Sequence, residues 1–498
     1  MTSTLEREVK LAASPAFRMP SLDELGDDVL TIPRDPERLQ TVYFDTQDFR
    51  LARWGVSLRH REGHGWTTKL PTDDARGDLL IRGEFTFPGE DPSHPPDEAV
   101  ALIRAYVRSS SLRPVVRLRT IRRLIQLLDL DDHLLGEVVD DEVSVLSGRR
   151  IAARFRELEV EITDDTPAGL LEEVLDRLRT AGAGAPDPTP KYVRAVGPLA
   201  TQAPEIQIAP LSSKAMVSQV LGRALSTSVV QLLRHDAVVR LDTDPEGVHL
   251  TRVATRRLRS DLRTFRSMVD HEWAEPLREE LRWFGTVLGE ARDADVLLAR
   301  LAGRTEMIPS TEAPGVAQVI EALEQRRKEA HISMIGSING ERYVALLDRL
   351  VEAAQAPVVL PEADVPVRDV VDDLLEGPWR HLRAAVKRAG KHPEDAELHT
   401  VRIRVKRVRY AADAVAPILG KSARRFAEAA ANLQTILGEH NDAVVAGSWL
   451  RTWSAVRRSG DAAFAAGTLA GIERAAARDA RERWRKAWKR LVVAREAM

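Results

Sequence analysis

Apolar and charged residues alternate with a period of two in short runs through residues 1–195, beginning with LEREVKL (5–11). This period is typical of strands, and eight such runs occur, separated by clusters of turn-forming residues. Two helical stretches, near 97–109 and 167–181, interrupt them. A series of mainly antiparallel strands of this kind indicates a closed barrel or a strongly curved sheet.

The pattern changes in GPLATQAPEIQIAPLSS, which contains three prolines and no clear period, and we interpret it as a linker. From Lys214 onward the apolar positions follow a helical period, and breaks near 303–316 and 354–367 divide this half in two. We therefore expect a multidomain α and β protein, with an eight-stranded antiparallel β tunnel or barrel and a few helices, followed by an all-α duplicated helical bundle. The expected divisions are a tunnel domain at 1–196, the linker at 197–213, and a helical domain at 214–498 with repeats at about 214–310 and 368–498.

Composition narrows the possible classes of protein. The 498 residues are 44% hydrophobic and include no cysteine, which excludes disulfides, thiolate metal sites and cysteine nucleophiles. No apolar run approaches the ~18–20 residues of a membrane span, and the start lacks the apolar core of a signal peptide, so we expect a cytoplasmic protein. Residues 1–200 carry 27 Lys and Arg against 35 Asp and Glu, whereas the remainder carries 46 against 40. This division indicates two different tasks.

The charged face of each front strand is nearly pure in sign. On a single strand, such a face usually means that one side lies in the core and the other in water. Across the set this interpretation weakens, because adjacent carboxylates repel unless a cation neutralises them. Mg²⁺ binds carboxylate oxygens, and guanidinium groups bind phosphate oxygens. These positions are Glu6, Glu8, Glu157, Glu159 and Glu161 for the carboxylates, and Arg59, Arg61, Lys69, Arg82, Arg117 and Arg119 for the cations. Turned inward, they would line a barrel for a metal and a polyanion.

The order of these residues resembles the CYTH domain of the triphosphate tunnel metalloenzymes, over roughly residues 3–196. The family signature Glu-x-Glu-x-Lys on the first strand is met by Glu6, Glu8 and Lys10. A single motif such as Glu-x-Glu-x-Lys often arises by chance and is weak evidence, whereas the ordered set of motifs is strong evidence for the resemblance. The later features are Arg59 and Arg61 on an Arg-x-Arg strand, Lys69 on a Thr-x-Lys strand, Arg82 and Glu84 on an Arg-x-Glu strand, Arg117 and Arg119 on a basic strand, Glu157 and Glu159 on a Glu-x-Glu strand, and Lys191 with Tyr192.

The resemblance implies an eight-stranded tunnel that acts on triphosphates with Mg²⁺ or Mn²⁺. It implies that water attacks a terminal phosphorus while the metal organises the triphosphate. The implied metal ligands are Glu6, Glu8, Glu157, Glu159 and either Asp140 or Asp141, of which we prefer Asp141. The implied catalytic, phosphate-holding residues are Lys10, Arg59, Arg61, Lys69, Arg82, Arg117, Arg119 and Lys191, together with the carboxylates Glu6, Glu8 and Glu84.

Two further residues of the front half need placing. Another basic position could be Arg122 or Arg123, and strand parity with Arg117 and Arg119 favours Arg123. His60 has the opposite parity to the arginines beside it, so we expect a packing or surface residue.

The rear half contains a repeat that is visible within the chain itself. HLTRVATRRLR (249–259) matches HTVRIRVKRVR (399–409), with a histidine first and basic residues at +3, +7, +8 and +10. Each is followed by an LGE…D segment, at 288–296 and 437–445. The first, +3, +7 and +10 positions lie on one face of a helix, and no acids at i+4 relieve their repulsion, which indicates a polyanionic partner.

Aromatic content decides which polyanion fits. Only Tyr410 adjoins the two stripes and the chain is 5% aromatic, so few aromatic side chains are available for nucleic-acid bases to stack on. A bare phosphate chain therefore fits better than nucleic acid. A further stripe near the C-terminus consists of Arg474, Arg478, Arg481 and Arg485.

Residues from about 214 to 498 resemble the CHAD domain, a duplicated helical bundle named for its histidines. The resemblance implies that a basic groove binds inorganic polyphosphate and that the protein associates with polyphosphate granules. The carried-over residues are His249, Arg252, Arg256, Arg257, Arg259, His399, Arg402, Lys406, Arg407 and Arg409. We expect salt bridges from Glu290, Asp293, Glu439 and Asp442 to orient them. Zinc is disfavoured, because cations at +3 and +7 of each stripe would repel it.

We therefore expect metal-dependent hydrolysis of a triphosphate, most simply inorganic tripolyphosphate, by the tunnel, and polyphosphate binding by the helical domain. One alternative is a polyphosphate-binding, granule-associated protein without catalysis. The other is a class IV adenylyl cyclase-like activity on ATP. No membrane partner is expected.

Overall fold

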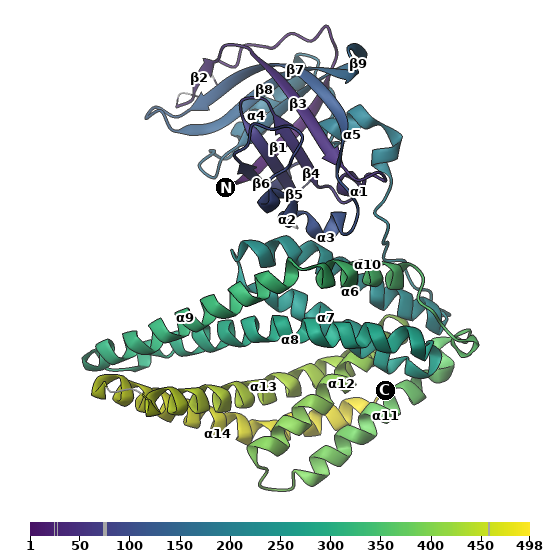
Figure 1. The fold of residues 1–498 in the computed structure, drawn as a ribbon, viewed down its shortest axis with the longest axis vertical. Coiled ribbons are helices and arrows are strands. Elements are labelled where there is room, and N and C mark those ends of the chain that lie inside the picture. The colour runs from purple at the N-terminus through teal and green to yellow at the C-terminus, as the bar shows by residue number, and fades with distance from the viewer. Residues whose placement is uncertain (24, 27, 73–76, 457–458) are drawn as a thin grey trace. The chain divides into compact units, whose positions relative to one another are not determined.

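The computed structural model describes residues 1–23, 25–26, 28–72, 77–456 and 459–498. They form two compact units, Met1–Glu205 and Ile206–Met498 (Figure 1). The division falls inside the predicted linker. The first part of that segment belongs to the first unit, because Pro198–Thr201 forms a short 3-10 helix whose Ala200 is buried there.

The strands of the first unit form one antiparallel sheet. Its order is β7-β3-β4-β5-β6-β1-β9-β8, and pairing of β8 with β7 closes an eight-stranded barrel. The eight predicted strands are thereby confirmed, whereas the short β2, which pairs with the end of β7, was not predicted. The bounds are β1 (Thr2–Ala13), β2 (Leu30–Pro33), β3 (Glu37–Asp45), β4 (Ser57–Arg61), β5 (Gly65–Pro71), β6 (Leu80–Phe87), β7 (Arg113–Leu128), β8 (Leu134–Ser147) and β9 (Arg150–Ile162).

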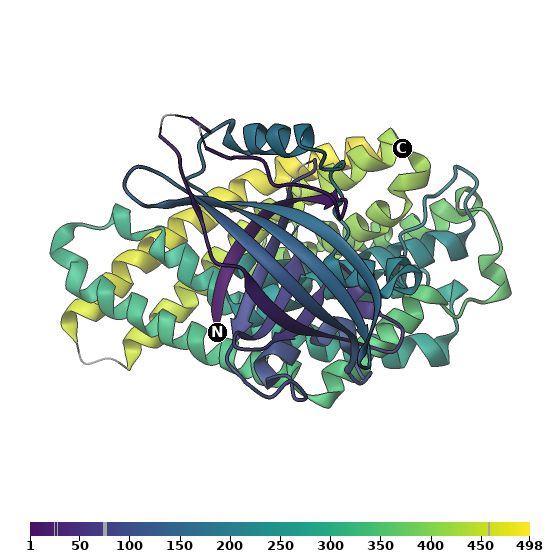
Figure 2. The same ribbon diagram turned by 90° about the horizontal axis from the view of Figure 1, so that it is seen from above.

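Along β1 and β9 the barrel is charged inside and apolar outside. Leu11, Leu158 and Val160 are buried on the outer surface. They pack in one cluster with the apolar side of helix α4 (Leu170–Thr180), which lies along the outside of the barrel (Figure 2). Burial of the apolar face under α4 leaves the charged face of each strand to point inward.

At one end the barrel interior is itself apolar. Val116, Leu118 and Val143 point inward and pack against Tyr192 of helix α5 (Lys191–Val196). The Tyr192 ring stacks on Tyr43 with centroids 5.0 Å apart, and its hydroxyl donates to the Val56 carbonyl at 2.6 Å. These contacts fix α5. The remaining helices of the unit are α1 (Arg50–Arg53), α2 (Asp97–Leu102) and α3 (Arg104–Val107).

The second unit consists of long helices. Its first half runs from α6 to α10, past the predicted repeat boundary near 310, and its second half from α11 to α14. Apolar residues of α8, α9, α13 and α14 share one core, and these four helices run side by side (Figure 1). The bounds are α6 (Val217–Leu241), α7 (Pro245–Thr264), α8 (His271–Ala302), α9 (Ala313–Ile338), α10 (Glu341–Gln355), α11 (Val367–Arg388), α12 (Asp395–Leu419), α13 (Lys421–Ala455) and α14 (Gly460–Glu496).

The two predicted stripes lie on α7 and α12, which contact each other, and the LGE segments lie on α8 and α13. Local sequence sets where α7 begins, since the Asp244 side chain accepts a hydrogen bond from the Glu246 amide and Pro245 takes the first helical position. None of the described helices has both the length and the apolar character needed to cross a lipid bilayer.

Candidate functional site

A cavity of about 130 Å³ inside the barrel is lined almost entirely by polar and charged side chains. Eight of the predicted catalytic residues line it, and Glu8 lies buried just beside them, paired with Lys10 at 2.8 Å. The lining consists of Glu6, Lys10, Tyr43, Ser57, Arg59, Arg61, Lys69, Arg82, Glu84, Arg122, Glu159, Glu161, Pro190, Lys191 and Tyr192.

Arg117 and Arg119 do not belong to this lining, and the prediction that they do is wrong. Both are exposed, because β7 turns Leu118 inward. Arg122, on the inner face of the same strand, lines the cavity instead and pairs with Asp141 at 2.7 Å. The preference for Arg123 is also wrong, since that side chain pairs with Glu142 at 2.8 Å and lies outside the lining.

Of the two adjacent aspartates, Asp141 is the one that faces the inside of the barrel. Asp141 is buried between Arg122 and Lys191 on the inner side. Asp140 points the other way and pairs with Arg156 at 2.6 Å. His60 is a buried packing residue, as expected, and its ring centroid lies 5.1 Å from that of Trp66 in an edge-on arrangement.

Three carboxylates gather at one side of the cavity. Glu6, Glu8 and Glu161 each offer an oxygen within 4.8 Å of the others, which is a donor set that suits a hard divalent cation. Burial, together with the nearby carboxylates of Glu159 and Glu6, raises the pKa of Glu161 to about 7. Glu161 was not among the implied ligands, although its parity with Glu157 and Glu159 could have identified it.

Glu6 and Glu8 of this cluster also pair with cations, Glu6 with Lys69 and Arg82 and Glu8 with Lys10 and Arg82. The other implied metal ligands lie outside the cluster and pair with cations too. Glu157 pairs with Lys191 at 3.2 Å, and Asp141 pairs with Arg122 and Lys191. Glu159 pairs with Lys10. Burial would raise the pKa of Glu159, but Lys10, Lys191 and Arg122 hold it well below its ordinary value. Of the predicted ligands, only Glu6 and Glu8 therefore belong to the carboxylate cluster.

A second side of the cavity carries excess positive charge. In the described part of the chain no carboxylate oxygen lies within 4 Å of the Arg61 guanidinium, and its buried Nε has no hydrogen-bond partner. Repulsion from Arg59, burial and repulsion from Arg122 lower the pKa of Arg61 to about 10. Arg59 lies 3.7 Å from Glu84, its nearest carboxylate. An anion that enters here would relieve this repulsion.

In the second unit, a groove of about 500 Å³ brings the two stripes together, and we call it the α7–α12 groove. Both histidines and the cations at +3 and +7 of each stripe line it, joined by side chains of α8 and α13, of which the sequence indicated only Asp293 and Asp442. The lining consists of His249, Arg252, Val253, Arg256, Arg292, Asp293, Val296, Leu297, Arg300, His399, Arg402, Lys406, Gln434, Asn441, Asp442 and Val445.

Crowded cations dominate the α7–α12 groove. Burial and repulsion from Arg402, Arg256 and Arg252 lower the pKa of Lys406 to about 7. Burial also lowers the pKa of Arg256, whose Nε donates to the Tyr410 hydroxyl. His399 is oriented through its Nδ1, which lies 2.8 Å from the Asn441 side-chain oxygen.

The remaining carried-over cations lie outside this groove, and their placement there is wrong. Arg257 and Arg407 follow the +7 residues by one position, and one residue turns a side chain by about 100° around a helix. Arg259 lies one turn farther along, beside Gly285 of α8. Arg409 pairs with Asp413 at 3.5 Å.

The LGE…D carboxylates behave in different ways. Asp293 pairs with Arg252 at 3.0 Å, as expected. Asp442 lines the groove near Arg402. Burial lowers the pKa of Arg402, and the charge of Asp442 offsets part of that decrease. Glu439 pairs instead with Arg483 of α14, and Glu290 is exposed.

Comparison with known proteins agrees with this division. The CYTH domain model matches residues 4–193 and the CHAD domain model matches residues 223–451. Two uncharacterized proteins of Mycobacterium tuberculosis, MT2285 of strain CDC 1551 / Oshkosh and Rv2226 of strain ATCC 25618 / H37Rv, are each 30% identical over 98% of this chain and 96% of their own.

Among solved structures, PptA from Streptomyces chartreusis is 23% identical, with 55% of this chain and 100% of that chain covered and a TM-score of 0.47. The CHAD domain from the plant Ricinus communis is 26% identical, with 57% and 94% covered and the same TM-score of 0.47.

Proposed function

Because the chain belongs to the family that joins a CYTH domain to a CHAD domain, we propose that its barrel is a metal-dependent triphosphatase and that its α7–α12 groove binds inorganic polyphosphate. Members of the CYTH family are triphosphate tunnel enzymes that usually depend on Mg²⁺ or Mn²⁺. The observation that carries the proposal is that one cavity joins a carboxylate cluster to Arg61, an arginine with no carboxylate oxygen within 4 Å among the described residues.

Glu6, Glu8 and Glu161 would hold the metal. Their oxygens lie close enough together for one ion, and the residues are all hard oxygen donors. A bound divalent cation would neutralise negative charge on the triphosphate oxygens and on the reacting phosphoryl group.

The phosphate chain would be held by the cations on the other side of the cavity. Arg59, Arg61 and Arg122 line that side from β4 and β7, and an anionic ligand would relieve their mutual repulsion. The apolar end of the barrel, where Tyr192 packs on Tyr43, helps to keep the charged cavity out of bulk water. Charges in such a site interact more strongly than in solution.

Inorganic tripolyphosphate is the proposed substrate. The cavity is small, and the aromatic residues among its described lining, Tyr43 and Tyr192, stack on each other, so they offer no open platform for a base. The polyphosphate proposed for the α7–α12 groove is also built of linked phosphates.

A substrate panel tests the barrel's proposed activity. The purified full chain would be given Mg²⁺ or Mn²⁺ with tripolyphosphate, ATP or thiamine triphosphate, and both inorganic phosphate and cyclic AMP would be measured. We expect phosphate release, fastest from tripolyphosphate. Cyclic AMP from ATP would replace this proposal with a cyclase, and no product from any substrate would leave a protein that only binds.

Polyphosphate binding by the groove rests on its crowding of cations from two stripes. Arg402→Ala with Lys406→Ala should weaken binding at least tenfold at low salt, as expected when charged hydrogen bonds to phosphate are lost. The matched control is Arg424→Ala with Arg425→Ala, since both arginines are exposed on α13 and lie outside the groove. Equal retention of polyphosphate by both variants would refute the groove assignment.

A further inference from the structure

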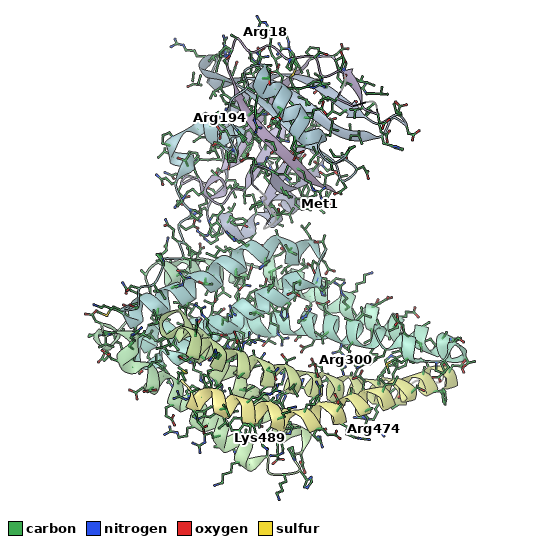
Figure 3. The ribbon with its side chains drawn as sticks, turned by 180° about the vertical axis from the view of Figure 1, so that it is seen from behind. Met1, Arg18, Arg194, Arg300, Arg474 and Lys489 are labelled. Carbon is green, nitrogen blue, oxygen red and sulfur yellow. The ribbon has the colours of Figure 1, made fainter. Side chains whose placement is uncertain are left out.

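The arginine stripe near the C-terminus borders a second cavity, of about 330 Å³, between α13 and α14. Arg474 lies on α14 at this surface (Figure 3). Arg478 and Arg481 follow it at the spacing of a helical face, and Arg451 joins them from α13. We call this the α13–α14 cavity. Neither the proposed triphosphatase nor the proposed polyphosphate groove uses it.

The cavity's carboxylates are already neutralised by other cations. Glu473 is completely buried, and Arg300 and Arg304 pair with it at 2.5 and 3.2 Å. Asp395 pairs with Arg481, and its oxygen lies 3.1 Å from Nε2 of His440. The acids of the cavity are therefore not free to balance its other arginines.

Three arginines remain with excess charge. Within the described residues, no carboxylate oxygen lies within 4 Å of the guanidinium groups of Arg451, Arg474 and Arg478. Arg474 and Arg478 stand at i and i+4 on α14, a spacing at which like charges on a helix repel each other. All three side chains line the cavity and are open to solvent, where an anion can reach them.

The floor of the hollow is made of small residues, Ala443, Gly447, Ala470 and Ala477. An ideal Cβ placed at Gly447 would lie 3.6 Å from Nη1 of Arg451, so the glycine leaves the guanidinium close to the helix backbone. None of the described residues that line the cavity is aromatic, so they offer nothing for bases to stack on. The chemistry favoured is a bare phosphate oxyanion gripped by guanidinium groups.

We propose that the α13–α14 cavity is a second binding site for inorganic phosphate chains. It lies on the face of α13 opposite the α7–α12 groove: Ala443 and Gly447 face the cavity, whereas Asn441 and Val445 face the groove. Arg300 links the two, since it lines the groove and pairs with Glu473 of the cavity. The ligand identity rests on the proposed polyphosphate function of the groove.

Site-resolved protection from chemical modification tests the second site. The full chain would react with an arginine-specific dicarbonyl reagent, with and without a short inorganic polyphosphate, in metal-free buffer, and mass spectrometry would follow each arginine. We expect Arg474 and Arg478 to react at least threefold more slowly with polyphosphate present. Arg490, exposed on the same helix and outside the cavity, should react at an unchanged rate.

Two variants separate this inference from the groove assignment. In Arg402→Ala with Lys406→Ala, protection of Arg474 and Arg478 should persist. In the full chain carrying Arg474→Ala and Arg478→Ala, polyphosphate binding should lose one class of sites, while Lys486→Ala with Lys489→Ala should bind as the unaltered chain does. Protection of Arg402 without protection of Arg474 and Arg478 would overturn the second site and leave the groove standing. Absence of protection at all three would overturn both.

Discussion

Glu8 on β1 and Glu161 on β9 stand directly opposite each other in the barrel wall. Residues so paired have Cβ atoms about 4.5–5.5 Å apart, and like charges at this distance destabilise a sheet. The two carboxylates are turned inward together with Glu6. Lys10, Lys69 and Arg82 balance Glu6 and Glu8 in part, whereas no cation lies within 4 Å of the Glu161 carboxylate among the described residues. A divalent cation would relieve the repulsion that remains at Glu161.

Removal of one carboxylate should weaken metal binding without unfolding the barrel. Glu161→Gln keeps the side-chain shape and removes a charge, so we expect Mn²⁺ affinity to fall about tenfold or more. Titration calorimetry on the full chain measures this. The control is Glu142→Gln, whose carboxylate pairs with Arg123 away from the cavity. Equal Mn²⁺ affinity for both variants would remove Glu161 from the metal site.

Arg122 and Arg119 lie on one strand but should differ sharply in their effect on turnover. We expect Arg122→Ala to lower kcat/KM for tripolyphosphate about a hundredfold, the usual effect of losing one preorganised donor to a developing negative charge. Arg119→Ala should stay within about twofold, since its side chain is exposed. Steady-state phosphate release measures both, and the reverse order of effects would contradict the assignment of the inner face of β7.

Polyphosphate affinity should depend on pH through Lys406. Its pKa of about 7 lies below the ordinary lysine value, and a polyanion favours the charged form, so binding takes up a proton. Affinity should therefore fall as the pH rises, by about tenfold between about pH 6 and about pH 8 for one such group. Equilibrium dialysis at matched ionic strength measures the change.

Histidines also face the α7–α12 groove, so the lysine must be isolated. His249, His399, Asp293 and Asp442 are the other titratable groups that line it besides the arginines. In Lys406→Arg the cation no longer titrates in this range, so the variant should bind more tightly than the unaltered chain at about pH 8. An unchanged pH profile in this variant would assign the dependence to the histidines.

Asp140 and Asp141 are neighbours in sequence, but we expect Asp140 to matter for stability and Asp141 for turnover. Arg156→Met would leave the buried Asp140 carboxylate with only Arg123, 3.5 Å away, and should lower the free energy of unfolding by about 3 kcal/mol. Denaturant titration of the barrel's unfolding measures this loss. Asp141→Asn should lower tripolyphosphate turnover instead, because that residue orients Arg122 and Lys191. If Asp141→Asn lowers turnover only as much as it lowers the fraction of folded protein, Asp141 has no separate role in turnover and the prediction is wrong.

Strand parity predicted the barrel well where one face of a strand has a single character throughout. On β1 and β9 the apolar face lies under α4, so the charged face had to turn inward. On β7 the rule failed, because the inner face is apolar at Val116 and Leu118 and only Arg122 of this strand brings charge to the cavity lining. The outward arginines therefore looked like the lining, and only the pairing of Arg122 with Asp141 across strands shows the inner register.

In the helical unit the repeat located the groove but not its limits. The +3 and +7 cations share a face with the histidines, and helical geometry alone brings them together on α7 and α12. The sequence could not show that the groove ends before Arg259. It also could not show that Arg292 and Arg300 of α8 complete the lining. Those depend on how four helices from distant parts of the chain pack.

Tripolyphosphate hydrolysis by the full chain and by two single variants, with Mg²⁺ or Mn²⁺ present, tests most directly whether the barrel is a triphosphatase. We expect the unaltered chain and Arg117→Ala to release phosphate at similar rates, because Arg117 is exposed outside the barrel. Glu8→Gln, which alters the carboxylate cluster, should lose nearly all activity. Release that persists in Glu8→Gln at the rate of the unaltered chain would contradict catalysis inside the barrel.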